Sequence, residues 1–243
     1  MSESHESFEG KSRIENTPQS QADSSSLLES GEIRSIKELE GYWGMHLVGI
    51  KDGDDAFFRP DKETAFIFES TGKDARRSDL EVVAFKIDKT LGFGLVPPVV
   101  YRTVNGTEGS LQKFIKDSPI AKQLKWRGTV KPEELTKAAV FDYLLDVKDR
   151  RGDNFLVNQA SGKIWLIDHD YWMFWNEILR SDILQETQTR GLNHITPETQ
   201  SALERFITSI DPLIIGAKSE VVKIVKKAQE RAKLILDKGK IPS

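Results

Sequence analysis

Apolar residues in the first half of the chain are grouped in short runs that predict strands and one helix. Four runs are expected to be extended: Met45–Ile50, Ala56–Arg59, Val96–Tyr101 and Ser110–Ile115. The Asp-Gly pair at 52–53 favours a hairpin turn between the first two runs, because it adopts positive φ at little cost. From Leu80 to Leu91 the apolar positions recur at three- and four-residue steps, which indicates a helix that Gly92 and Gly94 end.

The second half of the chain is expected to be mostly helical, with one hairpin inside it. Pro132 suits the first turn of a helix that runs to about Leu145. The apolar runs Phe155–Val157 and Lys163–Ile167 predict two short strands joined by a tight turn, and Ser219–Leu236 is the clearest of the later helices. A strand-rich half followed by a helical half is typical of an α+β fold with two lobes.

Composition narrows the class of protein. The 243 residues are 38% hydrophobic and 30% charged, a balance typical of a globular domain. A net charge of -3 gives no overall electrostatic signature for nucleic-acid binding. The absence of cysteine excludes disulfides, thiolate zinc sites and cysteine nucleophiles, and the four histidines lack the spacing of a zinc hydrolase.

The polar start of the chain is expected to be a tail. Residues 1–28 are rich in Ser, Glu, Gln and Asn and cannot bury enough apolar surface to offset the entropy of ordering, so we expect disorder there. This segment lacks the apolar stretch of a secretory signal, and no run of about 18 apolar residues predicts a transmembrane helix. We therefore expect a cytoplasmic protein.

Three polar residues that flank the predicted hairpin form the most informative pattern in the chain. Asp149 and Asn154 lie five residues apart before the first strand, and Asp168 follows the second strand. Because a hairpin brings its two ends together, the three side chains are expected to converge. One carboxylate could then orient a nucleophile, while the amide and the second carboxylate hold Mg²⁺ against ATP phosphates. The alternative for residues 149–154 is a solvated turn, since Asp, Gly and Asn all favour turns.

Phosphoryl transfer also needs a cation for the phosphates and a carboxylate that holds this cation. The candidate cation is Arg59 on the predicted return strand, and Glu81 on the following helix is its natural partner. Both residues also have an interpretation without a catalytic role. Arg59 could be a surface charge at a strand edge, and Glu81 could be an exposed carboxylate at the N-terminus of a helix, where the helix dipole favours negative charge. Lys62 and Lys51 are alternative cations, but Lys51 lies in the turn at the wrong end of the strand.

A family resemblance is carried by several segments in a fixed order: Glu81–Phe85, Leu91–Phe93, Val96–Val99, Gly109–Gln112, Phe141–Leu145, Asp149-Arg150, Asn154–Leu156 and Ile167–Asp170. The later segments resemble the catalytic loop and the Ile-Asp-x-Gly metal-binding motif of the phosphatidylinositol 3-/4-kinase-like branch of the protein-kinase-like superfamily. The earlier segments are similar to the small lobe of uncharacterised bacterial members. A more distant similarity links the chain to the secretory-pathway casein-kinase-like family.

The resemblance implies a two-lobed protein-kinase-like fold, with a β-rich small lobe at 29–118 and a mostly helical large lobe at 119–243. It implies an ATP- and Mg²⁺-dependent phosphotransferase that moves the γ-phosphate to a hydroxyl acceptor on a protein or lipid. The implied roles are a catalytic base at Asp149, metal ligands at Asn154 and Asp168, and nucleotide-binding residues at Arg59, Glu81 and Gln112, with Gln112 near the adenine.

Two residues depart from the family pattern. Arg59 stands where the family usually has Lys, and Asp170 stands where the Ile-Asp-x-Gly motif has Gly. Arginine differs from lysine in shape and bonding, and Asp170 adds a side chain and a charge to the metal-binding loop. These departures favour an alternative, a catalytically impaired pseudokinase that acts as a nucleotide-dependent binding module. Transfer of the nucleotide instead of the γ-phosphate also stays open.

The helix expected at Ser219–Leu236 has an apolar side and many basic residues. Such a helix could make peripheral contact with an anionic membrane, or it could pack on the core of the large lobe. Glu220 and Glu230 dilute the positive charge and favour the packed helix. No nucleic-acid partner is expected, because too few basic residues accompany the tryptophans for a binding groove.

Overall fold

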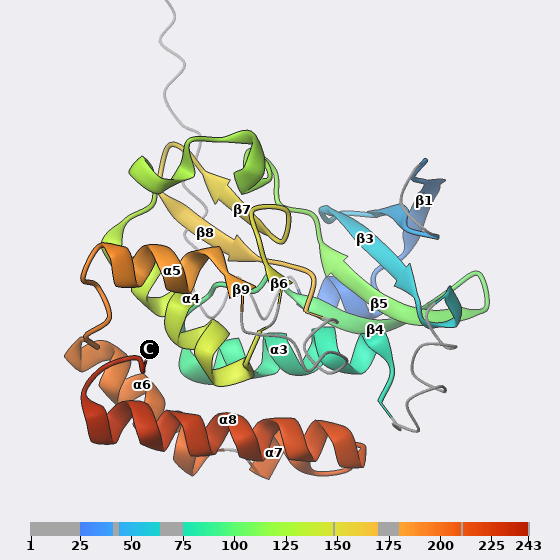
Figure 1. The fold of residues 1–243 in the computed structure, drawn as a ribbon. Coiled ribbons are helices and arrows are strands. Elements are labelled where there is room, and N and C mark those ends of the chain that lie inside the picture. Colours follow the sequence, from blue (N-terminus) through green and yellow to red (C-terminus); the bar gives the residue numbers. More distant parts are fainter. Residues whose placement is uncertain are drawn as a thin grey trace, which may run out of the picture.

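The computed structural model describes residues 25–40, 44–63, 75–147, 149–169, 180–209 and 211–242. Within these residues a β-rich N-terminal lobe adjoins a helical C-terminal lobe, and helix α3 (Arg77–Leu91) runs beneath both (Figure 1). The α+β, two-lobed architecture expected from the order of strands and helices is confirmed.

The small lobe is built on one antiparallel sheet with the strand order β1-β2-β3-β5-β4. Its strands are β1 (Ile33–Glu38), β2 (His46–Ile50), β3 (Asp55–Pro60), β4 (Val99–Val104) and β5 (Thr107–Lys113). Strands β2, β3 and β5 overlap the apolar runs that predicted them. Strand β4 begins at Val99 and not at Val96, because the two intervening prolines cannot donate ladder hydrogen bonds. Strand β1 was not expected, since its burial does not alternate along the strand.

Helix α3 packs against β4 and β5, and it begins at Arg77, before the expected Leu80. The earlier start is stabilised by Asp61, whose carboxylate accepts hydrogen bonds from the backbone N–H (3.0 Å) and the hydroxyl (2.7 Å) of Ser78. An acceptor at this position satisfies N–H groups that have no partner inside the helix. The helix ends as expected at Gly92, which adopts a left-handed conformation with φ 73°.

The large lobe contains helices α4 (Pro132–Leu145), α5 (Asp182–Thr189), α6 (Pro197–Thr208), α7 (Asp211–Ile214) and α8 (Ser219–Lys238). Helices α4 and α8 lie where the sequence predicted them. Between α4 and α5 lies the expected hairpin of β7 (Phe155–Asn158) and β8 (Lys163–Leu166). A short parallel pair, β6 (Asp149–Arg150) with β9 (Arg180–Ser181), accompanies it. Helix α8 runs along one edge of the molecule below α4 and α3 (Figure 1).

Two hydrophobic clusters fill the lobes. The larger cluster is shared by α3, α4, the β7–β8 hairpin and α8. The smaller cluster joins sheet residues such as Val48, Phe58 and Leu111 to Leu28. Because α3 contributes to the larger cluster, the small-lobe helix is fixed on the large lobe.

The expected tail boundary needs a correction. Residues 25–30 are helical, and Leu28 is buried with 4% of its surface exposed. Residues 25–28, assigned to the tail on composition, are therefore part of the small lobe, because Leu28 finds apolar partners on the sheet. The rest of the predicted tail lies outside the described residues. No helix in the described part of the chain combines the length and the apolar character needed to cross a membrane.

Candidate active site

Asp149 and Asn154 lie at the two ends of a tight loop that precedes β7. The Asn154 amide nitrogen donates to the backbone carbonyl of Asp149 (2.7 Å) and to its carboxylate (3.2 Å). With the nitrogen turned toward Asp149, the Asn154 amide oxygen points away from that residue. The Asp149 carboxylate also accepts a hydrogen bond from Arg151 (2.6 Å) and keeps 29% of its side chain exposed. The structure therefore brings these two predicted residues together.

Arg150 holds this loop against the end of β8. Its guanidinium is fully buried and donates to the backbone carbonyls of Asn154 and Ile167, at 2.6 Å each. The Ile167 N–H in turn donates to the Asn154 carbonyl (3.2 Å). The two ends of the hairpin are thus joined immediately before Asp168, so Asn154 and Asp168 are neighbours in space.

The charge of Arg150 is balanced by Asp142 on α4. Arg150 Nε donates to one Asp142 oxygen (3.0 Å), and the Ser181 hydroxyl donates to the other (2.8 Å). Ser181 also accepts from the Leu184 N–H (3.0 Å) and so caps α5. A buried arginine is tolerated when it is paired and hydrogen-bonded. The sequence pattern did not assign this network a role; the available signal was Asp142, a charged residue inside the apolar run of a helix.

Asp168 lies at the tip of β8 in a left-handed conformation with φ 61°, which is uncommon for a residue other than glycine. Its Oδ1 accepts hydrogen bonds from Arg59 (2.7 Å) and Arg77 (3.3 Å), and 26% of its side chain is exposed. Backbone conformations of this kind concentrate at functional sites. Arg77 was not predicted as a site residue. It precedes Glu81 by one helical turn on α3, but this local spacing does not indicate its contact with Asp168, which lies 91 positions away in the sequence.

Glu81 is nearly fully buried on α3 and links Arg59 to the end of β8. Its carboxylate lies 3.6 Å from the Arg59 guanidinium and accepts hydrogen bonds from the backbone N–H and from Nδ1 of His169, at 3.1 Å each. Burial favours a raised pKa for Glu81, but the hydrogen bond from His169 and the charge of Arg59 lower this pKa. Burial also lowers the pKa of His169, so a neutral imidazole donates to Glu81. The predicted pairing of Arg59 with Glu81 is found, although Asp168 lies closer to Arg59.

Gln112 shares a sheet face with Arg59. Gln112 lies opposite Phe57 and Ser110 lies opposite Arg59 in the antiparallel ladder between β3 and β5. Side chains two residues apart on a strand point to the same face, so Phe57, Gln112 and Arg59 lie on one side of the sheet. Phe57 also contacts Phe114 edge to face, with ring centroids 5.2 Å apart. The aromatic pair beside Gln112 was not predicted.

The alternative cations lie elsewhere. Lys51 forms an ion pair with Glu32 (2.7 Å) at the turn between β2 and β3. Lys62 is exposed just after β3 and forms no ion pair within the described residues. Arg59 is therefore the predicted cation that contacts Asp168. Asp170, the second departure from the family pattern, lies outside the described residues.

The residues present suit a divalent cation bound together with a nucleotide. Asp168 and Asn154 supply a carboxylate and an amide oxygen, the ligands that Mg²⁺ prefers. The described residues contain no cluster of three or more His, Cys, Asp or Glu side chains that could hold a metal ion. A cation here would take further oxygens from nucleotide phosphates or water. Gln112 Nε2 is buried and has no hydrogen-bond partner in the described structure, which suits a donor that meets a ligand acceptor.

Comparison with known proteins gives one match to a family model and several solved structures of similar fold. Residues 100–186, which include Gln112 and the three predicted residues around the hairpin, match the family model described as phosphatidylinositol 3- and 4-kinase. No curated protein gives a significant sequence match. The fold is similar to the crystal structure of the Golgi casein kinase with Mn/ADP bound, with a TM-score of 0.57, 15% sequence identity, and coverage of 91% of this chain and 75% of that one.

A second crystal structure of the Golgi casein kinase gives a TM-score of 0.57 and 14% identity, and it covers 91% of this chain and 76% of the other. At this level of identity the likeness establishes the fold. The chain therefore has a protein-kinase-like fold that carries, over residues 100–186, the sequence pattern of the phosphatidylinositol 3- and 4-kinase family.

Proposed function

We propose that this protein is an ATP- and Mg²⁺-dependent phosphotransferase that moves the γ-phosphate of ATP to a hydroxyl acceptor on a protein or lipid. The observation that carries the proposal is the joining of the Asp149–Asn154 loop to the end of β8, directly before Asp168, by buried Arg150. The match to a lipid-kinase family model and the Mn/ADP bound to a kinase of similar fold support nucleotide and divalent-metal use.

Each site residue has a role that follows from its chemistry. Asp149, partly exposed at the loop, would accept the proton of the attacking hydroxyl, and a positioned base contributes about 10²–10⁴-fold to a rate. Asn154 and Asp168 would hold the divalent cation, which when bound neutralises charge on the transferred phosphate. Arg59 would contact the phosphates, and Glu81 would keep the Arg59 guanidinium in place.

The base of the nucleotide would lie against the small-lobe sheet. Phe57 and Phe114 offer aromatic surface beside Gln112, whose buried amide nitrogen could donate to a ring nitrogen or carbonyl. A buried donor without a partner costs free energy, so a ligand acceptor at this position would be stabilised. The sequence assigned Gln112 to the adenine from family resemblance, and the geometry supports the same assignment.

Substitutions at two of the three predicted residues around the hairpin test the phosphotransferase proposal. Asp149→Asn and Asp168→Asn should each reduce phosphate transfer by at least about 100-fold. Asp149→Asn should change the melting temperature little, whereas Asp168→Asn leaves the shielded Arg59 and Arg77 without their carboxylate, so circular dichroism must show that this variant is folded at the assay temperature. Asp153→Asn is the matched control. Asp153 lies in the same loop but pairs with Lys122 (3.2 Å) at the surface, so its loss should leave activity within about two-fold. Full activity in Asp149→Asn or Asp168→Asn would refute the proposal.

A nucleotide-dependent binding module without catalysis is the second candidate. The contact of Arg59 with Asp168 favours it, because this contact neutralises the carboxylate that the metal ion requires. Binding of ATP with Mg²⁺ in a thermal-shift titration, without transfer of radiolabel to any acceptor or to the protein itself, would identify this module. Intact-mass analysis of labelled protein would distinguish a transferred phosphate from a transferred nucleotide.

We also propose peripheral membrane contact through α8, restricted to its charged side. The apolar residues of α8, including Val225, Ala228 and Ile235, are buried in the large-lobe core and cannot insert into a bilayer. The exposed side carries basic residues: Lys223, Lys226, Lys227 and Lys233. Contact of this kind depends on attraction to anionic lipid, and salt should abolish it.

A further inference from the structure

Two arginines converge on one oxygen of Asp168. Arg59 from β3 lies 2.7 Å from Asp168 Oδ1, and Arg77 from α3 lies 3.3 Å from the same atom. Both side chains are largely shielded, with 17% and 16% of their surface exposed. Glu81 lies one helical turn after Arg77 and 3.6 Å from Arg59, so two positive and two negative side chains are grouped here.

Two guanidinium groups that meet at one oxygen form a donor site for any anionic oxygen, and phosphate suits it particularly well. In the structure the Asp168 carboxylate takes this position. Under the proposed function the same carboxylate is a metal ligand. It cannot serve both roles equally, because a divalent cation beside two guanidinium groups is repelled by them.

We propose that Arg77 is a second phosphate-binding residue, and that Asp168 occupies the Arg59–Arg77 pair until a nucleotide phosphate replaces it. This inference rests on the proposed function. When a phosphate oxygen takes over the two arginines, Asp168 is released to face the divalent cation. Phosphate and metal ion therefore bind cooperatively, because a metal ion alone must withdraw Asp168 from two arginines that receive nothing in exchange.

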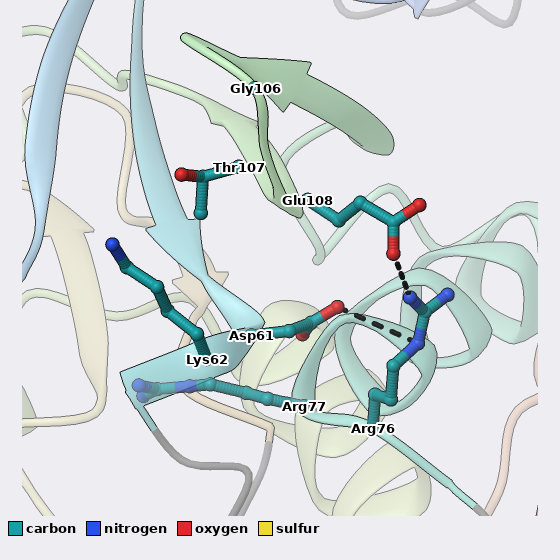
Figure 2. Close-up of a pocket in the computed structure, with 7 residues that line it drawn as sticks. All are labelled: Asp61, Lys62, Arg76, Arg77, Gly106, Thr107 and Glu108. Carbon is teal, nitrogen blue, oxygen red and sulfur yellow. Dashed lines mark hydrogen bonds and ion pairs between the residues drawn. The ribbon is translucent and has the colours of Figure 1, made fainter.

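Arg76, at the N-terminus of α3, is a matched control for Arg77. It directly precedes Arg77, but the two side chains leave the backbone in different directions (Figure 2). Both arginines line a cavity of about 320 Å³, but Arg76 forms ion pairs with Glu108 (2.7 Å) and Asp61 (3.6 Å). No hydrogen bond or ion pair joins Arg76 to Asp168 within the described residues. Loss of either arginine changes the net charge equally, but only loss of Arg77 alters the contacts of Asp168.

The test measures binding with the full chain as wild type, Arg77→Gln and Arg76→Gln. Calorimetric titrations use MnCl₂ alone and ADP at saturating Mn²⁺. Arg77→Gln should weaken ADP binding about 10-fold, the loss expected for one charge-assisted hydrogen bond. The same variant should bind Mn²⁺ alone several-fold more tightly, because Asp168 has one competing cation fewer. Arg76→Gln should change neither affinity by more than about two-fold.

The opposite signs separate phosphate binding from a structural role. A structural role for Arg77 would weaken both affinities or neither, and either result in Arg77→Gln would overturn the inference. If Arg77→Gln melts at a much lower temperature, Arg77→Lys replaces it in the test. Lysine keeps the charge without the planar guanidinium, so Arg77→Lys should show a smaller loss of ADP affinity. Unchanged ADP and Mn²⁺ affinities in Arg77→Lys would also overturn the inference. A wild-type chain that binds no ADP would overturn the proposed function itself, whereas normal ADP binding in Arg77→Gln overturns the role of Arg77 alone.

Discussion

Replacement of Arg150 by methionine probes the contact network on which the candidate site depends. Arg150→Met removes a fully buried guanidinium and keeps a long side chain in its place. It leaves the Asp142 carboxylate buried without its cation, and it removes the donor for the carbonyls of Asn154 and Ile167. Removal of one partner from a buried ion pair costs about 3–5 kcal/mol. This cost is a large share of the roughly 5–15 kcal/mol that stabilises a typical domain.

The double variant Arg150→Met/Asp142→Leu separates charge balance from positioning. Leucine removes the uncompensated charge, and replacement of a whole buried pair by apolar residues is often close to neutral. The Ser181 hydroxyl loses its acceptor in this variant, which costs about 1 kcal/mol, and the Ile167 carbonyl lacks its Arg150 donor in both variants. The part of the loss that comes from the uncompensated Asp142 charge should therefore return. The Arg150 bridge between the Asn154 and Ile167 carbonyls stays absent, so only the β7–β8 ladder and the hydrogen bond from the Ile167 N–H to the Asn154 carbonyl hold Asn154 and Asp168 near each other.

Urea unfolding followed by circular dichroism measures the free energy of unfolding, and calorimetry measures ADP affinity in Mg²⁺. Arg150→Met should lose about 3–5 kcal/mol of stability, and the double variant should be about 2–4 kcal/mol more stable than Arg150→Met. Both variants should bind ADP with Mg²⁺ at least about 10-fold more weakly, because the two residues proposed as metal ligands are held less firmly. Recovery of both stability and ADP affinity in the double variant would show that Arg150 balances charge and does not position the site.

Two further predictions concern pH and membranes. Burial raises the pKa of Asp88 to about 7, although hydrogen bonds from the Val96 and Leu95 N–H groups oppose the rise. The folded state then binds the extra proton between the unfolded pKa of 3.8 and this value, so stability should fall as pH rises through that window. The free energy of unfolding should fall by about 4 kcal/mol in total. Urea unfolding across that pH range should show this fall in the wild type and not in Asp88→Asn. An equal fall in both proteins would contradict a raised pKa for Asp88. If α8 contacts anionic membranes, the protein should co-sediment with vesicles that contain phosphatidylserine at low salt and not at about 0.5 M salt. Lys226→Glu/Lys227→Glu should abolish this sedimentation at an unchanged melting temperature, and salt-independent sedimentation would contradict an electrostatic contact.

Local patterns predicted the elements whose causes are local. The helix from Pro132 to Leu145 and the β7–β8 hairpin follow from apolar periodicity and turn residues that act within a few positions. The start of α3 was placed too late, because Ser78 is capped by Asp61, 17 residues away in the sequence. Strand β1 was missed for a related reason, since its place at the sheet edge depends on pairing with β2 and not on its own pattern.

The site residues also divide into those that local spacing indicates and those that depend on contacts between distant segments. Asp149, Asn154 and Asp168 could be selected from spacing around one hairpin. Arg77 could not, because its contact with Asp168 joins residues 91 positions apart. His169 was passed over for the same reason, since its partner Glu81 is 88 positions away. Contacts between distant segments are fixed by the packing of α3 on the large lobe, and the composition of either segment does not reveal them.

The packing of α3 also changes the significance of Arg59. One Arg59 nitrogen, Nη1, lies between Asp168 (2.7 Å) and Glu81 (3.6 Å), so arginine keeps a positive charge between the helix and the tip of β8. The departure from lysine therefore does not by itself remove the phosphate cation. For either candidate function, nucleotide binding together with a metal ion depends on whether Asp168 leaves the arginines. If it leaves, ADP binding requires a divalent cation; if it stays, the arginines remain neutralised and nucleotide binds weakly and independently of metal. Metal dependence of ADP affinity in the wild-type chain thus tests whether Asp168 leaves the arginines, before any acceptor is known.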